Sequence, residues 1–319
     1  MGWRVYDRPV PGAHPVLLAA AAPVHLHLTW FQTVVLGLVQ GLSELFPVSS
    51  LGHIVLLPSL FGWHQVVAVQ SDPESSWLAF VVMLHVGSAV GLLIYFWRTW
   101  IDIIVSFFRT LVKRRIETST ERLAWLIIIA TIPVGILGLL VEHPVRVALA
   151  KPLAASIFLV INGLILLGAE RYRKRAEVRA LAEREGMKRD GGRRLDTLEY
   201  KEAGIIGFFQ SFALIAGLSR DGICMATGLV RGLDNEDAAR FAFLLATPPI
   251  LAAGLLKFGD LTGPLGAGIR GDAIIAAIAA AITAVFTVHF LLRYFKTRTL
   301  TPFGIYCIVF GVAMVIYNL

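Results

Sequence analysis

Residues 30–63 read WFQTVVLGLVQGLSELFPVSSLGHIVLLPSLFGW, an apolar stretch that the polar cluster PVSSLGH at 47–53 interrupts midway. Proline and paired serines break a helix, so the stretch predicts helix, loop, helix rather than one continuous span. Residues 203–233 show the same pattern around the break GLSRDG at 217–222. Broken elements occur at membrane depth only where protein buries them or where they line a wet cavity, so both are interpreted as re-entrant hairpins.

The composition indicates a membrane protein. The 319-residue chain is 56% hydrophobic and 16% charged, with a mean hydropathy of +0.72. Soluble domains carry about 25% charged residues, so an ordinary soluble enzyme is excluded. Runs long enough to span a bilayer are 77–97, 123–141, 153–168, 238–258, 273–295 and 300–317. The sequence therefore predicts an all-α integral membrane protein with six transmembrane helices and two re-entrant helix-loop-helix hairpins.

Basic residues exceed acidic ones by 29 to 22, a net charge of +7. In a membrane protein this excess records topology and attracts anionic lipid, so no nucleic-acid partner is expected. The loops 98–122, 171–201 and 293–298 hold 20 Lys and Arg residues, against 3 in 64–76, 142–152 and 259–272. The positive-inside rule puts the first group in the cytoplasm, so the first hairpin enters from outside and the second from inside.

The two halves of the chain resemble each other at an offset of 170 residues. The matched positions are Gly37 with Gly207, Gln40 with Gln210, Ser49 with Ser219, and Gly52 with Gly222. One hairpin plus three spans in each half makes the second half an inverted repeat of the first, as in many transporters. The expected divisions are an N-terminal extension at 1–29, a first repeat at 30–170, a basic cytoplasmic loop at 171–202, and a second, inverted repeat at 203–319.

Polar residues of the two hairpins form the candidate site, because ionisable groups inside a membrane are costly and mark function by default. Two helix N-termini that face one cavity beside a guanidinium would bind an anion such as a phosphate. Glu44 would pair with Arg220 when the site is empty. The candidate residues are Gln40, Glu44, Ser49, Ser50 and His53 in the first hairpin, and Ser219, Arg220 and Asp221 in the second.

A structural interpretation of the same residues stays open. In it Ser49 and Ser50 cap a helix, His53 is a hydrogen-bonded core residue, and Glu44 and Arg220 form a structural pair. His85 and Asn162 lie within spans, where hydrogen bonding between helices is their expected role.

Three segments carry a resemblance to a known family: QGLSELFPVSSLGH at 40–53, AGLSRDGICMATG at 216–228 and FAFLLATP at 241–248. They resemble the integral-membrane undecaprenyl-diphosphate phosphatases, the bacitracin-resistance family, and the likeness covers roughly residues 30–319. The resemblance implies a multi-pass enzyme of the bacterial cell membrane. Such an enzyme hydrolyses undecaprenyl diphosphate to undecaprenyl phosphate and inorganic phosphate, which recycles the lipid carrier for cell-wall synthesis.

The resemblance also implies residue roles. Glu44, Ser50, His53 and Arg220 match the family's catalytic and phosphate-binding positions, and Gln40 matches its first E/Q position. Ser50 would attack the terminal phosphorus with His53 as general base, or His53 would itself attack. The phosphate-binding residues expected here are Gln40, Ser49, Ser219, Arg220 and Asp221. The family's dependence on divalent cations implies Mg²⁺ or Ca²⁺, with Glu44 as the candidate ligand.

The chain departs from the family pattern at several positions: Val81, His85, Ala216, Asp221 and Cys224. The Asp221 carboxylate would compete with phosphate for Arg220 or contribute a metal ligand. A catalytically inactive relative is therefore one alternative. A polyprenyl-phosphate transporter, or flippase, that uses the same headgroup site is another. The expected partners are the polyprenyl diphosphate lipid, membrane lipids and a second copy of the chain in a homodimer.

Overall fold

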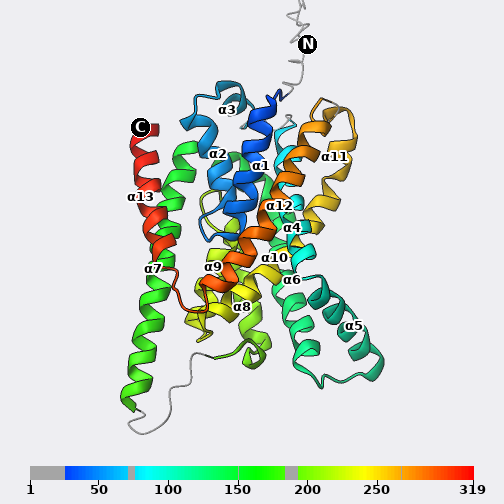
Figure 1. Ribbon diagram of the computed structural model, residues 1–319, viewed down its shortest axis with the longest axis vertical. Coiled ribbons are helices and arrows are strands. Elements are labelled where there is room, and N and C mark those ends of the chain that lie inside the picture. The colour runs from blue at the N-terminus through cyan, green and yellow to red at the C-terminus, as the bar shows by residue number, and fades with distance from the viewer. Residues whose placement is uncertain (1–25, 71–75, 150, 184–192, 267) are drawn as a thin grey trace, which may run out of the picture.

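The computed structural model describes residues 26–70, 76–149, 151–183, 193–266 and 268–319 of the chain. These residues fold into a bundle of helices (Figure 1). Residues 1–25 of the expected N-terminal extension and residues 184–192 of the expected basic loop lie outside the described residues. The α-helices are α1 Trp30–Leu45, α2 Ser50–Leu60, α3 His64–Gln70, α4 Trp77–Tyr95, α5 Trp97–Lys113, α6 Ser119–Leu149, α7 Pro152–Glu183, α8 Tyr200–Gln210, α9 Arg220–Val230, α10 Asn235–Leu256, α11 Phe258–Thr262, α12 Arg270–Tyr294 and α13 Thr301–Asn318. Short 3₁₀ helices are η1 Leu195–Thr197, η2 Ser211–Leu214 and η3 Pro264–Gly266.

Six helices of the described residues are long and apolar enough to cross a membrane: α4, α6, α7, α10, α12 and α13. Each corresponds to one of the runs expected from the sequence. The predicted all-α architecture with six spans is therefore confirmed.

Two segments expected as basic loops are partly helical. Residues 97–113 form α5, and α7 continues past the apolar run to Glu183. Arg, Lys, Glu and Ala are strong helix formers, and charged pairs three or four residues apart support a helix in water. Arg173 makes two such contacts on α7, at 2.8 Å to Glu170 and 3.3 Å to Glu177. The basic loop expected at 171–202 thus begins as a helical extension.

The two broken elements form helix pairs. Helices α1 and α2 are separated by residues 46–49, and α8 and α9 by η2 and residues 215–219. Figure 1 shows α1 and α2 in the upper part of the molecule and α8 and α9 in the lower part. This arrangement is compatible with two re-entrant hairpins that enter from opposite sides.

The breaks of the two pairs touch each other. The Ser49 hydroxyl accepts hydrogen bonds from the backbone N–H of Gly52 at 3.1 Å and of Gly217 at 3.2 Å. Gly217 has φ +99°, and a Cβ there would lie 2.3 Å from the carbonyl oxygen of Ala155. Only glycine tolerates both constraints, so this residue lets the second break reach the first. Asn162 joins both breaks as well, because its amide donates to the Pro47 carbonyl at 2.9 Å and accepts from Ser219 N–H at 3.0 Å.

Positions paired at the 170-residue offset make equivalent contacts. Gly37 on α1 lies against the Ala276 backbone of α12, and Gly207 on α8 lies against the Ala130 backbone of α6. Ser219 caps α9 through Gly222 N–H at 3.0 Å, as Ser49 caps α2. These contacts are compatible with an inverted repeat.

A charged cluster fixes the start of α8. The buried Glu202 carboxylate contacts Arg193 at 2.9 Å and Arg231 at 3.1 Å. Burial alone would raise the pKa of Glu202. The hydrogen bond from Arg193, the backbone N–H of Glu199 and the two guanidinium charges outweigh burial, so this pKa lies below its ordinary value. The cluster ties the second hairpin to the preceding segment through Arg193.

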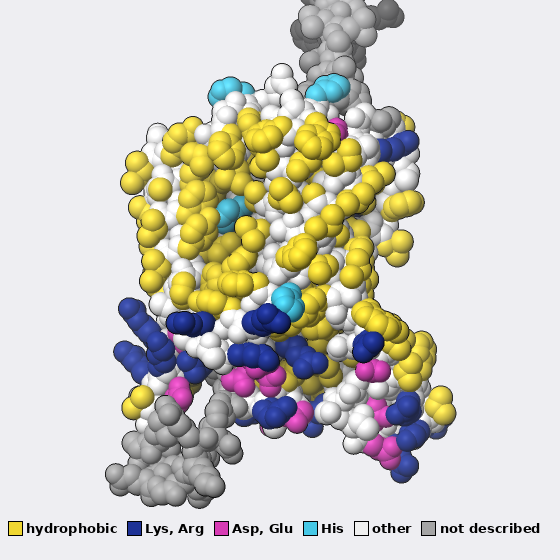
Figure 2. Space-filling model, in the orientation of Figure 1, with side chains coloured by type: hydrophobic (Ala, Val, Ile, Leu, Met, Phe, Trp, Pro, Cys, Tyr) yellow, Lys and Arg dark blue, Asp and Glu magenta, His cyan; other side chains and the backbone are white. Residues whose placement is uncertain are grey.

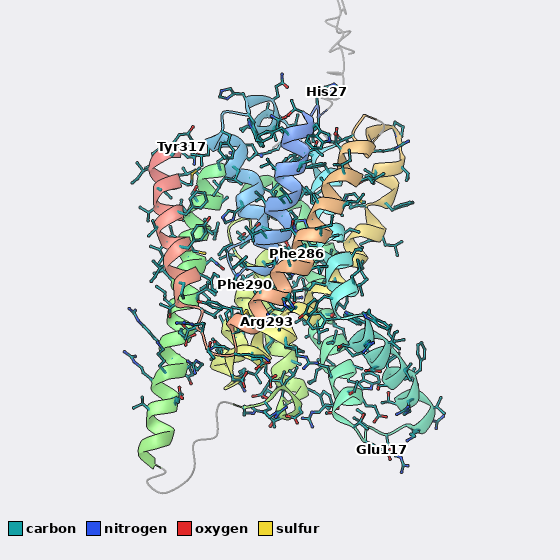
Figure 3. The ribbon with its side chains drawn as sticks, in the orientation of Figure 1. His27, Glu117, Phe286, Phe290, Arg293 and Tyr317 are labelled. Carbon is teal, nitrogen blue, oxygen red and sulfur yellow. The ribbon has the colours of Figure 1, made fainter. Side chains whose placement is uncertain are left out.

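The surface has the separate apolar and charged zones of a membrane protein. Figure 2 shows a broad hydrophobic band, with Lys and Arg gathered below it. Figure 3 places Arg293 and Glu117 toward this lower end and His27 and Tyr317 at the upper end, with Phe286 in the band between them. The positive-inside rule therefore predicts that the lower end faces the cytoplasm.

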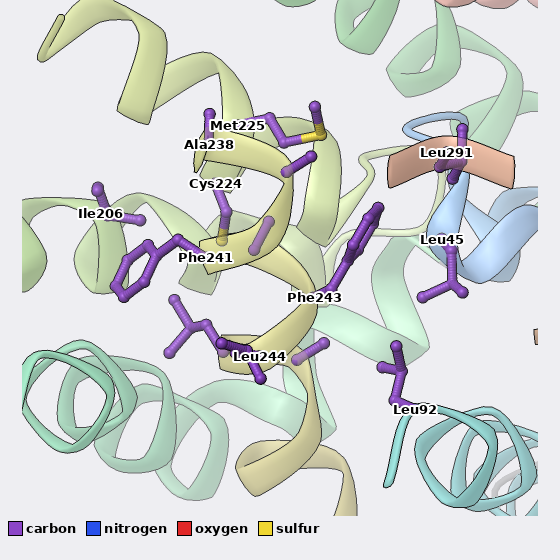
Figure 4. Packing of buried hydrophobic residues seen from close by; sticks show 14 of the residues in the cluster. Leu45, Leu92, Ile206, Cys224, Met225, Ala238, Phe241, Phe243, Leu244 and Leu291 are labelled. Carbon is purple, nitrogen blue, oxygen red and sulfur yellow. The ribbon is translucent and has the colours of Figure 1, made fainter. Parts of the chain in front are cut away.

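Helix α10 runs through the core. Figure 4 shows Phe243 on the side of α10 that faces Leu45 and Leu291, and Phe241 on the opposite side near Ile206. All of these side chains belong to one buried cluster. The α10 helix is thereby packed against α1 of the first hairpin and α8 of the second.

Candidate functional site

A cavity of about 360 Å³ lies where the two hairpins meet α4, α6 and α10. Most of its lining is apolar, including Val81, Val134, Leu139, Ile250 and Ala253. A smaller polar set lines the same cavity: Glu44, Ser49, Ser50, Gln70, His85, Thr131, Gln210, Ser219, Arg220 and Lys257. A cavity of this composition suits a molecule with one charged end and one apolar end.

Glu44 and Arg220 connect the hairpins inside this cavity. Glu44 lies in the last turn of α1, and Arg220 is the first residue of α9. Their side chains form an ion pair, as expected from the sequence. Arg220 Nη1 also donates to the Ala246 carbonyl of α10 at 3.1 Å. One guanidinium therefore binds a carboxylate and a core helix at once.

The second carboxylate oxygen of Glu44 accepts hydrogen bonds from two more side chains. Gln40 lies one turn earlier on the same face of α1, and its Nε2 donates to Glu44 Oε2 at 2.9 Å. The Ser50 hydroxyl donates to the same oxygen. Ser50 begins α2 but does not cap it, since Ser49 makes the capping hydrogen bond. The Ser50 hydroxyl thus points to Glu44 and lines the cavity instead of capping α2.

Two helix N-termini lie beside this group. Ser49 and Ser219 cap α2 and α9, and both serines line the cavity. Helix N-termini carry unpaired backbone N–H groups and a partial positive charge, which favour an anion. The Arg220 guanidinium lines the same cavity, so the arrangement can bind a phosphate group.

Comparisons with known proteins identify the family of the chain. The sequence model of the family described as "Bacitracin resistance protein BacA" matches residues 33–313. The chain belongs to the BacA family.

Relatives of this BacA-family chain match over nearly their full length. It is 50% identical over 330 residues to "Undecaprenyl-diphosphatase 2" of Frankia alni, covering 89% of this chain and 96% of the relative. It is 49% identical over 299 residues to "Undecaprenyl-diphosphatase" of Mycolicibacterium paratuberculosis, covering 91% and 98%. "Undecaprenyl-diphosphatase" of Acidiphilium cryptum is 38% identical over 283 residues, covering 87% and 94%. The resemblance noted from the sequence is confirmed.

His53 lies apart from the polar set of this BacA-family cavity. Its Nδ1 lies 2.8 Å from the Ser49 carbonyl and its Nε2 lies 2.7 Å from the Tyr306 hydroxyl of α13. The ring stacks on Tyr306 and Phe310, and it does not line the cavity. The carbonyl can only accept, so Nδ1 carries the proton and Nε2 accepts from the tyrosine. The expected role as base or nucleophile is not supported by this placement.

His85 is the histidine that the structure brings to the site. Its Nε2 lies 3.4 Å from Glu44 Oε2 and 3.5 Å from Ser50 Oγ, and the ring lines the cavity. The sequence expectation gave this residue a helix-packing role. The overlooked signal was its position as an ionisable residue in the first span after the first hairpin.

Asp221 lies behind Arg220 rather than in the cavity. Its carboxylate is fully buried, 3.8 Å from Arg220 Nε, and does not line the cavity. It therefore does not reach a ligand in this arrangement, contrary to the expected phosphate contact. Cys224, another departure, donates its thiol to Gln210 Oε1 at 3.3 Å.

The residues present do not form a metal cage by themselves. Among the residues that the structure describes, no three His, Cys, Asp or Glu side chains are grouped to hold a metal ion. Glu44 is the one carboxylate lining the described cavity. Mg²⁺ is often bound through one or two carboxylates completed by water and substrate phosphates. Glu44 fits such a site only together with a phosphorylated ligand.

Proposed function

We propose that the chain hydrolyses undecaprenyl diphosphate to undecaprenyl phosphate and inorganic phosphate. One observation carries the proposal: Arg220, Ser50 and Glu44 meet in a cavity whose remaining walls are mainly apolar. A diphosphate head fits the polar group and a prenyl tail fits the apolar walls. Relatives that are about half identical in sequence are named undecaprenyl-diphosphatase. The six spans and the family place the chain in the bacterial inner membrane.

The diphosphate is bound by replacing part of the Glu44–Arg220 contact. The guanidinium is a planar fork that can hold two phosphate oxygens at once. The N-termini of α2 and α9 add backbone N–H groups on the same side. Ser49 and Ser219 shape these N-termini, because their hydroxyls already cap the helices.

Ser50 is the nucleophile in this proposal. Its hydroxyl faces the cavity and is oriented by the hydrogen bond to Glu44. Attack on the terminal phosphorus forms a bond from Ser50 Oγ and breaks the bond to the bridging oxygen, which leaves with undecaprenyl phosphate. Arg220 stabilises the charge that develops on the phosphoryl oxygens. Water then releases the phosphate from Ser50.

His53 acts as a positioning residue. It holds the Ser49 carbonyl from one side and the Tyr306 hydroxyl from the other, which links the first break to α13. Ser49 itself has φ +68°, a conformation that costs a non-glycine residue energy. The His53 contact helps to keep this turn, and therefore Ser50, in place.

A divalent cation remains part of the proposal. Mg²⁺ or Ca²⁺ would be held by Glu44 together with phosphate oxygens of the substrate, and it would neutralise phosphate charge. The homodimer considered from the sequence also stays a prediction.

Replacement of Ser50 by Ala tests the assignment. The variant is expected to bind undecaprenyl diphosphate but to release no inorganic phosphate, measured with purified protein in detergent. Release at the wild-type rate would remove Ser50 from the mechanism. Lipid binding without phosphate release by the wild-type chain would instead favour the flippase alternative, which the names of the relatives do not favour.

A further inference from the structure

Helix α5 exposes an apolar face along its length. Its opposite side packs on α6, where the ring centroids of Phe107 and Trp125 lie 5.4 Å apart and the Trp125 indole donates to Thr110 Oγ1 at 3.0 Å. The exposed apolar side chains recur every three or four residues, which places them on one side of the helix. They are Ile101, Ile104, Val105, Phe108, Leu111 and Val112.

A basic side of α5 runs beside this apolar face. Arg98, Arg109 and Lys113 are exposed, and Asp102 is the one acidic residue of the helix. Charged side chains are costly in the hydrocarbon core, so α5 does not cross the membrane. An exposed apolar face next to a basic one is instead the pattern of a helix that lies at a membrane surface.

The position of α5 fits a membrane surface. The span α4 ends at Tyr95, and α5 begins two residues later at Trp97. The Trp97 ring is exposed, with the Arg98 guanidinium 5.0 Å from its centroid, and tryptophan is enriched where lipid tails meet headgroups. Figure 1 shows α5 at the lower right, and Figure 2 shows hydrophobic side chains that continue from the band into this region beside Lys and Arg. The apolar face of α5 therefore continues the lipid-facing surface toward the basic end of the molecule.

A second cavity, of about 480 Å³, lies at the C-terminal end of α5. Its lining residues are Thr110, Leu111, Arg114, Arg115, Ile116 and Trp125. Arg115 pairs with Glu117 at 2.8 Å, whereas Arg114 makes no ion pair within the described part of the chain. Guanidinium groups beside apolar side chains suit a ligand that has an anionic head and an apolar body.

We propose that this second cavity binds the phosphate headgroup of an anionic phospholipid, and that the apolar face of α5 lies among the acyl chains beside it. Charge complementarity selects the lipid, because residues 97–116 hold five basic residues and one acidic residue. Clusters of this kind bind the anionic lipids of a cytoplasmic leaflet. The site is distinct from the proposed phosphatase site, since the two cavities share no lining residue.

Nitroxide labels can measure the depth of α5 in full-length protein reconstituted into vesicles of phosphatidylcholine and phosphatidylglycerol. Phe108→Cys puts a label on the apolar face and Arg109→Cys puts one on the basic side, while the two native cysteines are buried. We expect oxygen, which concentrates among lipid tails, to relax the first label more, and a water-soluble nickel complex to relax the second more. Equal access of the nickel complex to both labels would place the apolar face in water and overturn the proposal. Protection of the first label from both reagents would overturn it too, because a second copy or another protein would then cover the face.

Recognition of the headgroup is tested by titrating purified protein with phosphatidylglycerol and counting bound lipid by native mass spectrometry. One double variant, Arg114→Gln with Arg115→Gln, removes two charges from the cavity. The matched control, Lys174→Gln with Arg175→Gln, removes two exposed charges from the lower part of α7. Each basic residue near an anionic lipid surface contributes about fivefold, so the first double variant should bind the lipid about 30-fold more weakly than wild type. The control should bind it as wild type does.

Three results of this titration would contradict the headgroup site. They are equal affinities of the two double variants, equal affinity of wild type for phosphatidylcholine, and displacement of the lipid by inorganic phosphate at the same concentration. Inorganic phosphate should not compete, because it has no acyl chain to contact Leu111 and Ile116. Neither experiment uses phosphatase activity, so the lipid site and the proposed function are tested separately.

Discussion

The Glu44 carboxylate at the end of α1 pairs with the Arg220 guanidinium at the start of α9, and so joins two broken elements from opposite halves of the chain. Both side chains are largely buried. A buried ion pair is costly to break, because the remaining partner keeps an uncompensated charge. The ion pair therefore joins the two hairpins. It also provides a preformed cationic group that a phosphate can bind.

Replacement of Arg220 by Lys should show whether phosphate release needs the planar shape of the guanidinium or only its positive charge. The guanidinium reaches Glu44 with one nitrogen and the Ala246 carbonyl with another. A lysine ammonium is a point charge and cannot reproduce the planar fork. We expect kcat/KM for phosphate release to fall at least about 100-fold. A variant within a factor of about two of wild type would show that charge alone is enough.

Replacement of Gly207 by Ala should weaken the packing of α8. A Cβ at Gly207 would lie 2.0 Å from the Ala130 carbonyl oxygen of α6, so the helices must move apart. Gly204 is the control on the same helix, since its nearest atom would be 3.8 Å away. Overpacking typically costs about 1–3 kcal/mol, so Gly207→Ala should unfold at lower temperature than wild type. Equal unfolding temperatures for Gly207→Ala and Gly204→Ala would contradict this contact.

A substitution at Gly135 can test whether the apolar walls of the cavity bind the prenyl tail. This residue of α6 lines the cavity, and an added Cβ would meet no atom within 4 Å. Gly135→Phe should therefore place a ring in cavity space and raise KM for the long lipid. Gly168→Phe on α7 is the control, because Gly168 is also open but does not line the cavity. Similar KM values for the two variants would argue that the prenyl tail lies elsewhere.

The Glu202 cluster predicts how stability depends on pH. Its contacts with Arg193 and Arg231 hold the pKa of Glu202 below the ordinary value, so the folded state favours the charged form. The stabilisation is complete above the unfolded pKa of about 4.3 and is lost as pH falls through the lower folded pKa. Unfolding temperature should fall over this acidic range in wild type, and less steeply in Glu202→Gln. Parallel curves for the two proteins would exclude Glu202 as a contributor.

The sequence predicted the scaffold of the site better than its acid–base chemistry. Helix-breaking clusters and ionisable residues in apolar stretches are local signals, and they located Glu44, Ser50 and Arg220 correctly in one cavity. The direction in which a histidine ring points depends on neighbouring helices. The contact of His53 with Tyr306 joins residues 253 positions apart, and spacing along one helix cannot reveal it.

The choice between His53 and His85 shows the same limit. Ser50 and His53 are three residues apart, which suggested a shared face, yet the His53 ring turns toward the Ser49 carbonyl and α13. His85 reaches Ser50 from α4, whose position is set by tertiary packing. The helix α5 was missed for a simpler reason: its basic residues were counted as a loop, although its apolar residues recur with helical spacing.

The most direct test of the account is inorganic phosphate release from undecaprenyl diphosphate by the purified chain in detergent, beside Arg220→Ala, each with and without EDTA. We predict steady release by wild type, loss of release in Arg220→Ala, and a lower wild-type rate in EDTA. Wild-type protein that binds the lipid but releases no phosphate, or an Arg220→Ala variant with wild-type turnover, would contradict the central claim.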